Sequence, residues 1–276
     1  MKVLGKSSPL LQSVRLVLSP ESMATVAERR IGAVIGSLVA DAAVQPIHWN
    51  YNKEKLTALL STRSDWEFWE PSQNPFYVQK TGKQTCYGDQ NFVVLKSLVE
   101  NSGINSDHLK KSLYEYFGAG TTYDNPIWSG GPKTIPITGC WRNGSIRDFL
   151  KNYEEKKQET GSESDEQVDC VLRIIPVAAL YAGHPQLLDK VEEVVRLTQN
   201  NDVAVAFGLL AARLLEIYIL NGPTADAIGQ LRAKLTDPKR SSPSDLDTAL
   251  VSHLQKVLQV KDKPHVDVAC NVFKNN

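Results

Sequence analysis

The segment Arg30–Tyr51, RIGAVIGSLVADAAVQPIHWNY, decides the fold. Its residues from 31 to 44 are almost all apolar or small, in a chain of which 22% of the residues are charged. A helix that is apolar around its whole circumference is typical of the centre of a domain, where other elements cover it on every side. Pro46 ends the run, because the residue before a proline is pushed out of the helical region. We therefore predict a buried central helix that stops before Pro46.

One carboxylate lies near the C-terminal end of this predicted helix. Asp41 is that residue, and His48 follows it in a dense polar and aromatic exit from the helix. Burying a carboxylate alone is very costly, so Asp41 is expected to have hydrogen-bond partners or a cation. His48 taken alone is more often a packing residue than a catalyst. Ser37, one turn before Asp41, is expected to bond back to the helix backbone.

Charge and length restrict the classes of partner. Lys and Arg together number 31, as do Asp and Glu, so no overall basic field indicates binding to nucleic acid or to an acidic membrane surface. No run reaches the roughly 18–20 continuous apolar residues that a membrane span requires. We therefore expect neither a nucleic-acid partner nor a membrane partner. The oligomeric state stays open.

The cysteines and the N-terminal residues bear on the compartment. The four cysteines are far apart and form no Cys-x-x-Cys pair, and the five histidines are scattered, which disfavours a structural zinc site. Reduced thiols in an intracellular protein are the simpler interpretation. Residues 1–20 lack acidic side chains and are rich in serine, like a transit peptide, but they hold a single arginine. We expect a flexible tail over residues 1–18 and a cytoplasmic protein, with mitochondrial import as the alternative.

Further helices are predicted from the spacing of apolar residues and from capping signals, and almost no two-residue alternation is present. The predicted helices cover residues 19–45, 54–61, 88–101, 106–116, 145–156, 168–182, 185–199, 201–220, 224–235 and 244–260. Pro176 is expected to kink the helix over residues 168–182. Residues 119–144 form a loop with Trp128 and Trp141, and a connection of that length is usually functional. Residues 158–166 are interpreted as an exposed loop without chemistry. The sequence predicts an all-α fold in one domain over residues 19–276.

From the residues alone, the candidate site comprises Asp41, His48, Asp89 and the loop 119–144. Asp89 stands where a helix is predicted to begin, so ordinary N-capping is its competing interpretation. We find neither a Gly-rich phosphate loop followed by lysine nor a serine or cysteine nucleophile motif. These observations lead no further than a helical domain with a buried acidic site.

Several motifs along residues 29–222 occur in the order in which the ADP-ribosylglycohydrolase family has them, and the chain resembles that family. Its opening motif reads Gly-Asp-Ala-x-Gly-x-Pro-x-Glu. In this chain Asp41, Ala42 and Pro46 match that motif, alanine and valine replace the two glycines, and His48 stands at the glutamate.

Three later motifs of the family are altered in this chain. Residues 87–90, YGDQ, fall at the metal motif Thr-Asp-Asp-Thr, so that only Asp89 remains as a carboxylate. Residues 168–173, VDCVLR, fall at Asn-Gly-x-x-Met-Arg, of which Arg173 remains, and Gln199 falls where histidine is common. The combination is similar to the branch that holds the jellyfish lens J-crystallins and selenoprotein J.

The resemblance implies an all-α, many-helix orthogonal bundle, here C-terminally short and lacking the last family helices. Active members bind two magnesium ions and hydrolyse ADP-ribosyl bonds, with ligands from the Thr-Asp-Asp motif and from a late Asp-x-Asp-Thr/Ser motif. Magnesium prefers near-octahedral oxygen ligands, so each lost carboxylate matters. Residues 244–248, SDLDT, spell the late motif, but they follow a Ser/Pro linker and open an amphipathic helix. That position favours helix-dipole stabilisation over metal binding.

Two functions are expected from this resemblance. The favoured one is a non-catalytic homologue with a degenerate metal site and a structural role, as in the eye lens, or a binding role. The alternative is an active hydrolase of ADP-ribosyl bonds, in which Asp89 and Asp41 orient water or a single cation and His48 is the general base, as a histidine that titrates near working pH.

The remaining expectations concern ligands. An ADP-ribose-type small molecule is the expected partner, and no cofactor is expected, except magnesium if the site is partly functional. The substrate-binding candidates are Asp41, Gln90, Trp128, Trp141 and Arg173.

Overall fold

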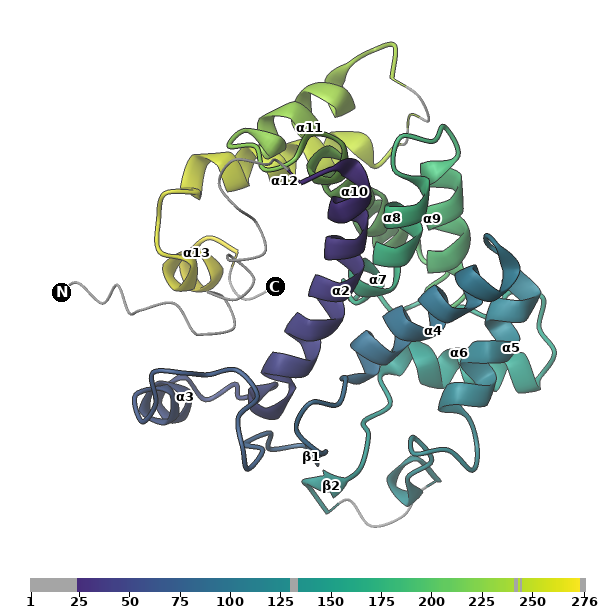
Figure 1. Ribbon diagram of the computed structural model, residues 1–276, viewed down its shortest axis with the longest axis vertical. Coiled ribbons are helices and arrows are strands. Elements are labelled where there is room, and N and C mark those ends of the chain that lie inside the picture. Colours follow the sequence, from purple (N-terminus) through teal and green to yellow (C-terminus); the bar gives the residue numbers. More distant parts are fainter. Residues whose placement is uncertain (1–23, 130–133, 241–242, 244, 274–276) are drawn as a thin grey trace.

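The computed structural model describes residues 24–129, 134–240, 243 and 245–273, and their regular structure is almost entirely helical (Figure 1). The α-helices in chain order are α2 (Val26–Val44), α3 (Lys53–Leu60), α4 (Cys86–Asn101), α5 (Ser106–Phe117), α6 (Gly144–Glu154), α7 (Cys170–Arg173), α8 (Ile175–Tyr181), α9 (Leu187–Arg196), α10 (Asp202–Asn221), α11 (Ala227–Thr236), α12 (Asp247–Val260) and α13 (His265–Asn271). Short 3-10 helices cover Gln45–Ile47 and Pro126–Ser129. The predicted all-α class is confirmed.

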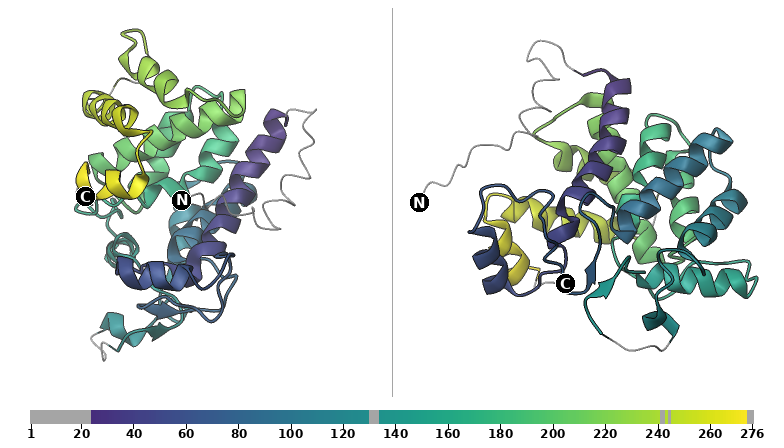
Figure 2. Two further views of the ribbon diagram at one scale, coloured as in Figure 1. Left: turned by 90° about the vertical axis from the view of Figure 1, so that its left-hand side faces the viewer. Right: turned by 60° about the horizontal axis from the view of Figure 1, so that its bottom comes forward.

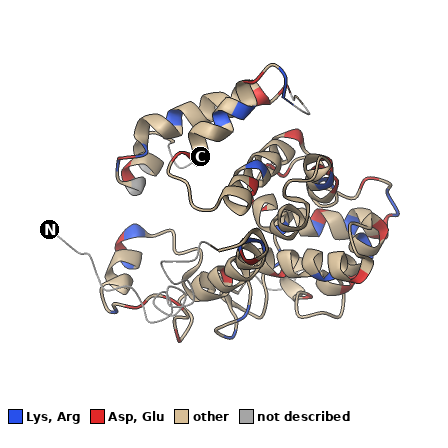
Figure 3. Ribbon diagram, turned by 45° about the horizontal axis from the view of Figure 1, so that its top comes forward, with Lys and Arg blue, Asp and Glu red and all other residues tan. Residues whose placement is uncertain are grey.

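Two hydrophobic cores and a third, small cluster of Ala179, Ala182 and Ile219 organise the described helices, and α10 takes part in all three. The larger core includes Val94 of α4, Phe117 of α5 and Phe149 of α6, all fully buried. The smaller core joins Ile217 of α10 to Leu231 of α11. Figure 1 shows α4, α5 and α6 grouped at one end and α11 and α12 at the other. Charged residues of both signs are mixed over the elements (Figure 3), as the balanced composition predicts.

Helix α2 is not covered on every side, so the prediction of a fully buried central helix is wrong. It packs against α8, α10 and α4, but Ile31 is 59% exposed and Ile35 is 56% exposed. Val39 lies on the same exposed side, and a Cβ at Gly32 or Gly36 would meet no atom within 4 Å. Figure 2 shows α2 along an edge of the molecule. An apolar circumference permits burial on all sides but does not supply the elements that would cover it.

The helix starts differ from the predicted ones. Thr25 caps α2, and its side chain accepts from the backbone of Glu28 in a capping box. The predicted start at Ser19 and the predicted tail over residues 1–18 lie outside the described residues. Thr85 caps α4, which begins at Cys86, two residues before the predicted start at Gly88. Asp89 therefore lies inside the first turns of α4 and is not the cap, so the N-capping interpretation of Asp89 is wrong.

The chain around Pro176 and the long loop follow the predictions more closely. Residues 168–182 contain two helices, α7 and α8, with a break at Ile174, because proline cannot supply the backbone donor that a continuous helix needs. In the long loop, β2 (Ile137–Thr138) pairs in parallel with β1 (Tyr77–Val78). This short pairing ties the loop to the segment between α3 and α4.

By length and composition alone, two helical segments are long and apolar enough to cross a membrane, Val26–Ile47 and Asp202–Asn221. Core helices of water-soluble proteins meet the same criteria, so this finding is weak. Arg213 is buried within α10, and Glu216 follows it one turn later, so the second apolar run is not continuous.

Candidate functional site

Asp41 joins α2 to the start of α4. The backbone amide of Thr85 donates to Oδ2 of Asp41 at 2.6 Å, and the Thr85 hydroxyl donates to Oδ1 at 2.6 Å. Asp41 is 8% exposed, and this burial raises the pKa of its carboxyl, against the lowering effect of the two bonds from Thr85. The buried carboxylate thus has hydrogen-bond donors as partners, and its two oxygens are both engaged in holding the N-terminus of α4.

Gly88 faces this carboxylate at very short range. A Cβ added at Gly88 would lie 2.2 Å from Oδ2 of Asp41 and 2.3 Å from Oε1 of Gln84. Cβ atoms essentially never approach another atom within 3.0 Å. Gln84 could move, but Asp41 is held by two hydrogen bonds. Position 88 therefore has no room for a side chain while Asp41 keeps its place.

The two-magnesium site implied by the resemblance requires a carboxylate at position 88, and the residues present do not fit it. Asp89 is the one acidic side chain of residues 87–90. Among the described residues, no group of three or more His, Cys, Asp and Glu side chains is placed to hold a metal ion.

Asp89 lies one helical turn after Thr85 and is engaged with tyrosines. The hydroxyl of Tyr123 donates to Oδ2 of Asp89 at 2.6 Å. Burial raises the pKa of Asp89 to about 6, and hydrogen bonds from Tyr123 and Tyr116 act in the opposite direction. Asp89 therefore titrates near neutral pH, which is a property of carboxyls that transfer protons.

His48 does not titrate near neutral pH, in contrast to the expectation for a general base. Burial lowers the pKa of its ring to about 4. Its Nδ1 lies 3.5 Å from the hydroxyl of Tyr77, a long contact. The ring is neutral at pH 7 and accepts a proton only in acid.

An aromatic cluster surrounds the exit from α2. Trp49, whose backbone takes the left-handed conformation with a φ of 62°, has ring contacts with Phe76, Tyr77, Tyr87 and Trp141. The ring of Trp128 meets that of Trp141 edge-on at 4.9 Å between centroids. The structure thus brings the two predicted tryptophans of the long loop together and places them against the Trp49 cluster.

Gln90 and Arg173 meet in a buried polar network. Arg173 is 1% exposed, and its Nη1 donates to Oε1 of Gln90 at 2.7 Å. Its Nη2 donates to Oε1 of Gln199. Asp169 Oδ2 lies 3.5 Å from Nη1 of Arg173. Because these partners come from different elements, Arg173 joins α7 to α4 and to the connection between α9 and α10, where Gln199 lies.

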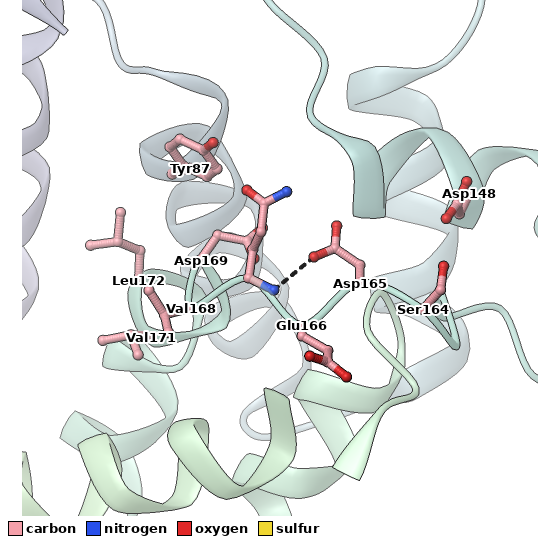
Figure 4. Close-up of a pocket in the computed structure, with 10 residues that line it drawn as sticks. Tyr87, Asp148, Ser164, Asp165, Glu166, Val168, Asp169, Val171 and Leu172 are labelled. Carbon is pink, nitrogen blue, oxygen red and sulfur yellow. Dashed lines mark hydrogen bonds between the residues drawn. The ribbon is translucent and has the colours of Figure 1, made fainter. Parts of the chain in front are cut away.

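A cavity of about 1000 Å³ lies beside this network, and residues 164–169 form much of its lining (Figure 4). The prediction that residues 158–166 form an exposed loop is wrong in part, since Thr160 and Ser162 are buried. Asp165 lines the cavity, and its Oδ1 accepts from Nε2 of Gln199 at 3.1 Å. Tyr87 lines it from α4. None of the predicted substrate-binding side chains is among the described lining residues. The i,i+4 pair of Asp169 and Arg173 was the signal in the sequence that could have located the cavity.

Asp247, in the second candidate metal motif, pairs with a basic side chain. Nε of Arg240 donates to Oδ2 of Asp247 at 2.8 Å, and Asp247 is 1% exposed. Helix α12, which Asp247 opens, packs on α11 and α10. Asp247 also lies in the first turn of α12, where the sequence interpretation expected it to interact with the helix dipole.

Comparisons with known proteins agree with this architecture. A family model described as ADP-ribosylglycohydrolase matches residues 22–273. Crystallin J1A of Tripedalia cystophora is 39% identical over 210 residues, which cover 76% of this chain and 64% of the relative. Crystallin J1B of the same organism is 41% identical over 197 residues, which cover 71% of this chain and 60% of that relative. The chain thus spans less than two thirds of the length of these curated relatives.

A solved structure has a similar fold. Its title is "ADP-ribosylglycohydrolase-related protein complex", its TM-score is 0.53 and its sequence identity is 15%. The match covers 86% of this chain and 77% of the solved chain. At this identity the likeness concerns the fold alone.

Proposed function

Since the chain belongs to the ADP-ribosylglycohydrolase family, we propose that it is a non-catalytic member in which the fold has a structural or binding role. The observation that carries the proposal is the contact between Gly88 and Asp41. The family motifs have an aspartate at position 88 as well as one at position 41, whereas in this chain a Cβ at position 88 would lie 2.2 Å from Oδ2 of Asp41 in its present position. The metal site of active members is therefore degenerate in this chain.

Two further observations support this proposal. Asp89 accepts a hydrogen bond from Tyr123 at 2.6 Å, so one of its oxygens already has a partner. His48, which stands at the glutamate of the family motif, carries no negative charge and is neutral at pH 7 because burial lowers its pKa to about 4. Neither residue replaces a lost carboxylate ligand.

The structural role rests on the relatives named crystallins, which are 39% and 41% identical to this chain. A crystallin role requires a folded, stable domain and does not require turnover. The buried contacts of Asp41 with Thr85 and of Arg173 with Gln90 are of that stabilising kind.

The test is catalysis itself. Purified full-length chain is incubated with an ADP-ribosylated protein, with and without magnesium, and free ADP-ribose is measured by chromatography. We expect no release above the protein-free control, and no heat on calorimetric titration with magnesium. Magnesium-dependent release of ADP-ribose would refute the proposal.

One observation favours the alternative of an active hydrolase. The pKa of Asp89, raised to about 6, suits a group that exchanges a proton near neutral pH. If the chain does release ADP-ribose, Asp89→Asn should abolish the release, whereas Glu163→Gln, an exposed acidic position outside the site, should not. Full activity of the Asp89→Asn variant would exclude that role for Asp89.

A further inference from the structure

A second cavity, of about 410 Å³, lies where α10, α11 and the connection from α8 to α9 meet. A cavity of this volume can hold a small organic molecule. Leu187 and Leu235, each 3% exposed, supply apolar wall, and Arg213 of α10 also lines the cavity while being only 7% exposed. Charged side chains are almost never buried to that extent unless they are paired, so the partners of Arg213 decide what the cavity can bind.

The guanidinium of Arg213 has no direct partner within the described part of the chain. Its nitrogens donate no hydrogen bond there and take part in no ion pair. Nη1 is fully enclosed, whereas Nε and Nη2 keep accessible surface. Because Arg213 lines the cavity, a ligand there can reach the edge of the guanidinium that Nε and Nη2 form. A buried donor without an acceptor is costly, so this edge indicates an acceptor that a ligand would supply.

The acidic side chains that act on Arg213 are engaged with other groups. Oε1 of Glu216 accepts from the backbone amide of Gly183 at 2.8 Å, and Oδ2 of Asp247 accepts from Nε of Arg240 at 2.8 Å. Burial lowers the pKa of Arg213 and outweighs the opposite effect of these two carboxylates. A guanidinium is not deprotonated in proteins, so Arg213 carries its charge without a counter-ion in direct contact.

Other groups in the lining also favour an anion. Lys234 and Arg240 line the cavity with Arg213, so that three cationic side chains stand beside two acidic ones among the described lining residues. Asp247, which pairs with Arg240, balances the remaining charge, so the position of Arg213 rather than the net charge favours an anion. Nδ1 of His184 accepts from a backbone amide two residues later at 3.2 Å, so the neutral ring carries its proton on Nε2 and is a further donor.

We propose that this cavity binds an oxyanion, a carboxylate or phosphate group on a short apolar stem, with Nε and Nη2 of Arg213 as its anchor. The edge of a guanidinium matches two oxygens of either group and forms charge-assisted hydrogen bonds with them. The three leucines of the lining pack against the stem. The inference goes beyond the proposed function, because the cavity shares no described lining residue with the candidate metal site at positions 88 and 89 and does not depend on whether a metal binds there.

The experiment is a titration of the ¹⁵N-labelled full-length chain, followed by NMR chemical shifts. The probes are n-butyrate and n-butyl phosphate, which separate the two kinds of oxyanion, with 1-butanol and n-butylammonium as the neutral and cationic analogues. We expect saturable shifts at residues 183–188 and 234–237 with at least one of the two anions. Butanol and butylammonium should bind more weakly than that anion, because neither accepts from a guanidinium as an oxyanion does.

Three variants locate the site. Arg213→Met should weaken anion binding by about tenfold or more, because it removes the charge-assisted hydrogen bonds of the anchor. Lys234→Gln changes an exposed side chain, so its effect is measurable even if Arg213→Met does not fold, and it should weaken binding about threefold by removing one charge near the ligand. Arg232→Met, at an exposed position of α11 outside the described cavity lining, is the matched control and should leave the affinity unchanged.

Four results would overturn the proposal. They are the absence of saturable binding by either anion, binding of butanol or butylammonium as tight as that of the anion, undiminished anion affinity in the cavity variants, and an equal loss in Arg232→Met, which would indicate general attraction to a basic surface. None of these results bears on whether the chain releases ADP-ribose, so this inference and the proposed function fail separately.

Discussion

Arg173 donates a 2.7 Å hydrogen bond to Gln90, a residue 83 positions earlier in the chain, in a site where the guanidinium is 1% exposed. The contact joins α7 to α4. Gln199 accepts from the same guanidinium, and Asp169 lies 3.5 Å away. Nε of Arg173 and Oδ1 of Asp169 have no hydrogen-bond partner among the described residues, so the stability of this buried network depends on the bonds that its other atoms make.

Arg173→Met is therefore expected to lower the free energy of unfolding by about 3–5 kcal/mol, because it leaves two buried amide oxygens without their donor and the buried carboxylate of Asp169 without its opposite charge. Arg196→Met is the matched control, since Arg196 pairs with Glu192 and Asp202 at the surface. That change should cost about 0–1 kcal/mol. Urea unfolding followed by circular dichroism measures both, and equal losses would show that the network contributes no more than a surface pair.

Gly88→Ala is expected to destabilise the protein by about 1–3 kcal/mol, because the added Cβ would overlap Asp41 and force a shift in packing. Gly36→Ala, in the exposed part of α2, is the control. A Cβ there meets nothing within 4 Å, so alanine should stabilise the helix by about 0.5–1 kcal/mol. Urea unfolding measures both changes. The same sign of effect for the two variants would contradict the packing at Gly88.

The raised pKa of Asp89 predicts that the protein loses stability as pH rises. Its folded-state pKa of about 6 lies above the ordinary value of 3.8, so between these values the folded state binds more protons than the unfolded state. The free energy of unfolding should therefore fall, by an amount on the order of 2 kcal/mol, as pH rises from about 4 to about 6. Asp89→Asn should remove this fall, which chemical denaturation at stepped pH would detect.

The lowered pKa of His48 predicts the opposite dependence of stability on pH. Its pKa of about 4 in the folded state lies below the ordinary value of 6.5, so the unfolded state binds more protons over that range. Stability from this residue is lost as pH falls from about 6.5 to about 4. His48→Asn should make the protein less sensitive to acid in that window. If His48→Asn and Asp89→Asn changed the pH profile in the same direction, the burial argument for one of the two residues would be wrong.

Much of the fold could be predicted from local signals. Asn201 before an apolar run marks the start of α10, and Pro176 marks the break between α7 and α8, because capping and proline act within a few residues. The exposed face of α2 could not be predicted. Ile31 and Ile35 are as apolar as core residues, and only the arrangement of other elements decides whether they are covered.

Parts of the candidate site could likewise be predicted from the sequence, and other parts could not. Asp41 was identified as a buried carboxylate in need of partners, but its partner Thr85 lies 44 residues away, and no local pattern joins the two. Arg173 was identified through the family resemblance, whereas the cavity beside it was missed. Asp165 lies in a polar stretch whose composition is typical of an exposed loop, and Asp169 stands near the start of a predicted helix. Their contacts with Gln199 and Asn143 join residues that are distant in sequence.

The contact between Gly88 and Asp41 also has an evolutionary consequence. A single substitution that placed aspartate at position 88 would meet the Asp41 carboxylate before it could contribute a ligand. Such a chain would lose stability at the intermediate step and gain nothing in return, unless Asp41 had moved first. An aspartate at position 88 would therefore need an accompanying shift of Asp41, so that one substitution in α4 depends on a side chain of α2.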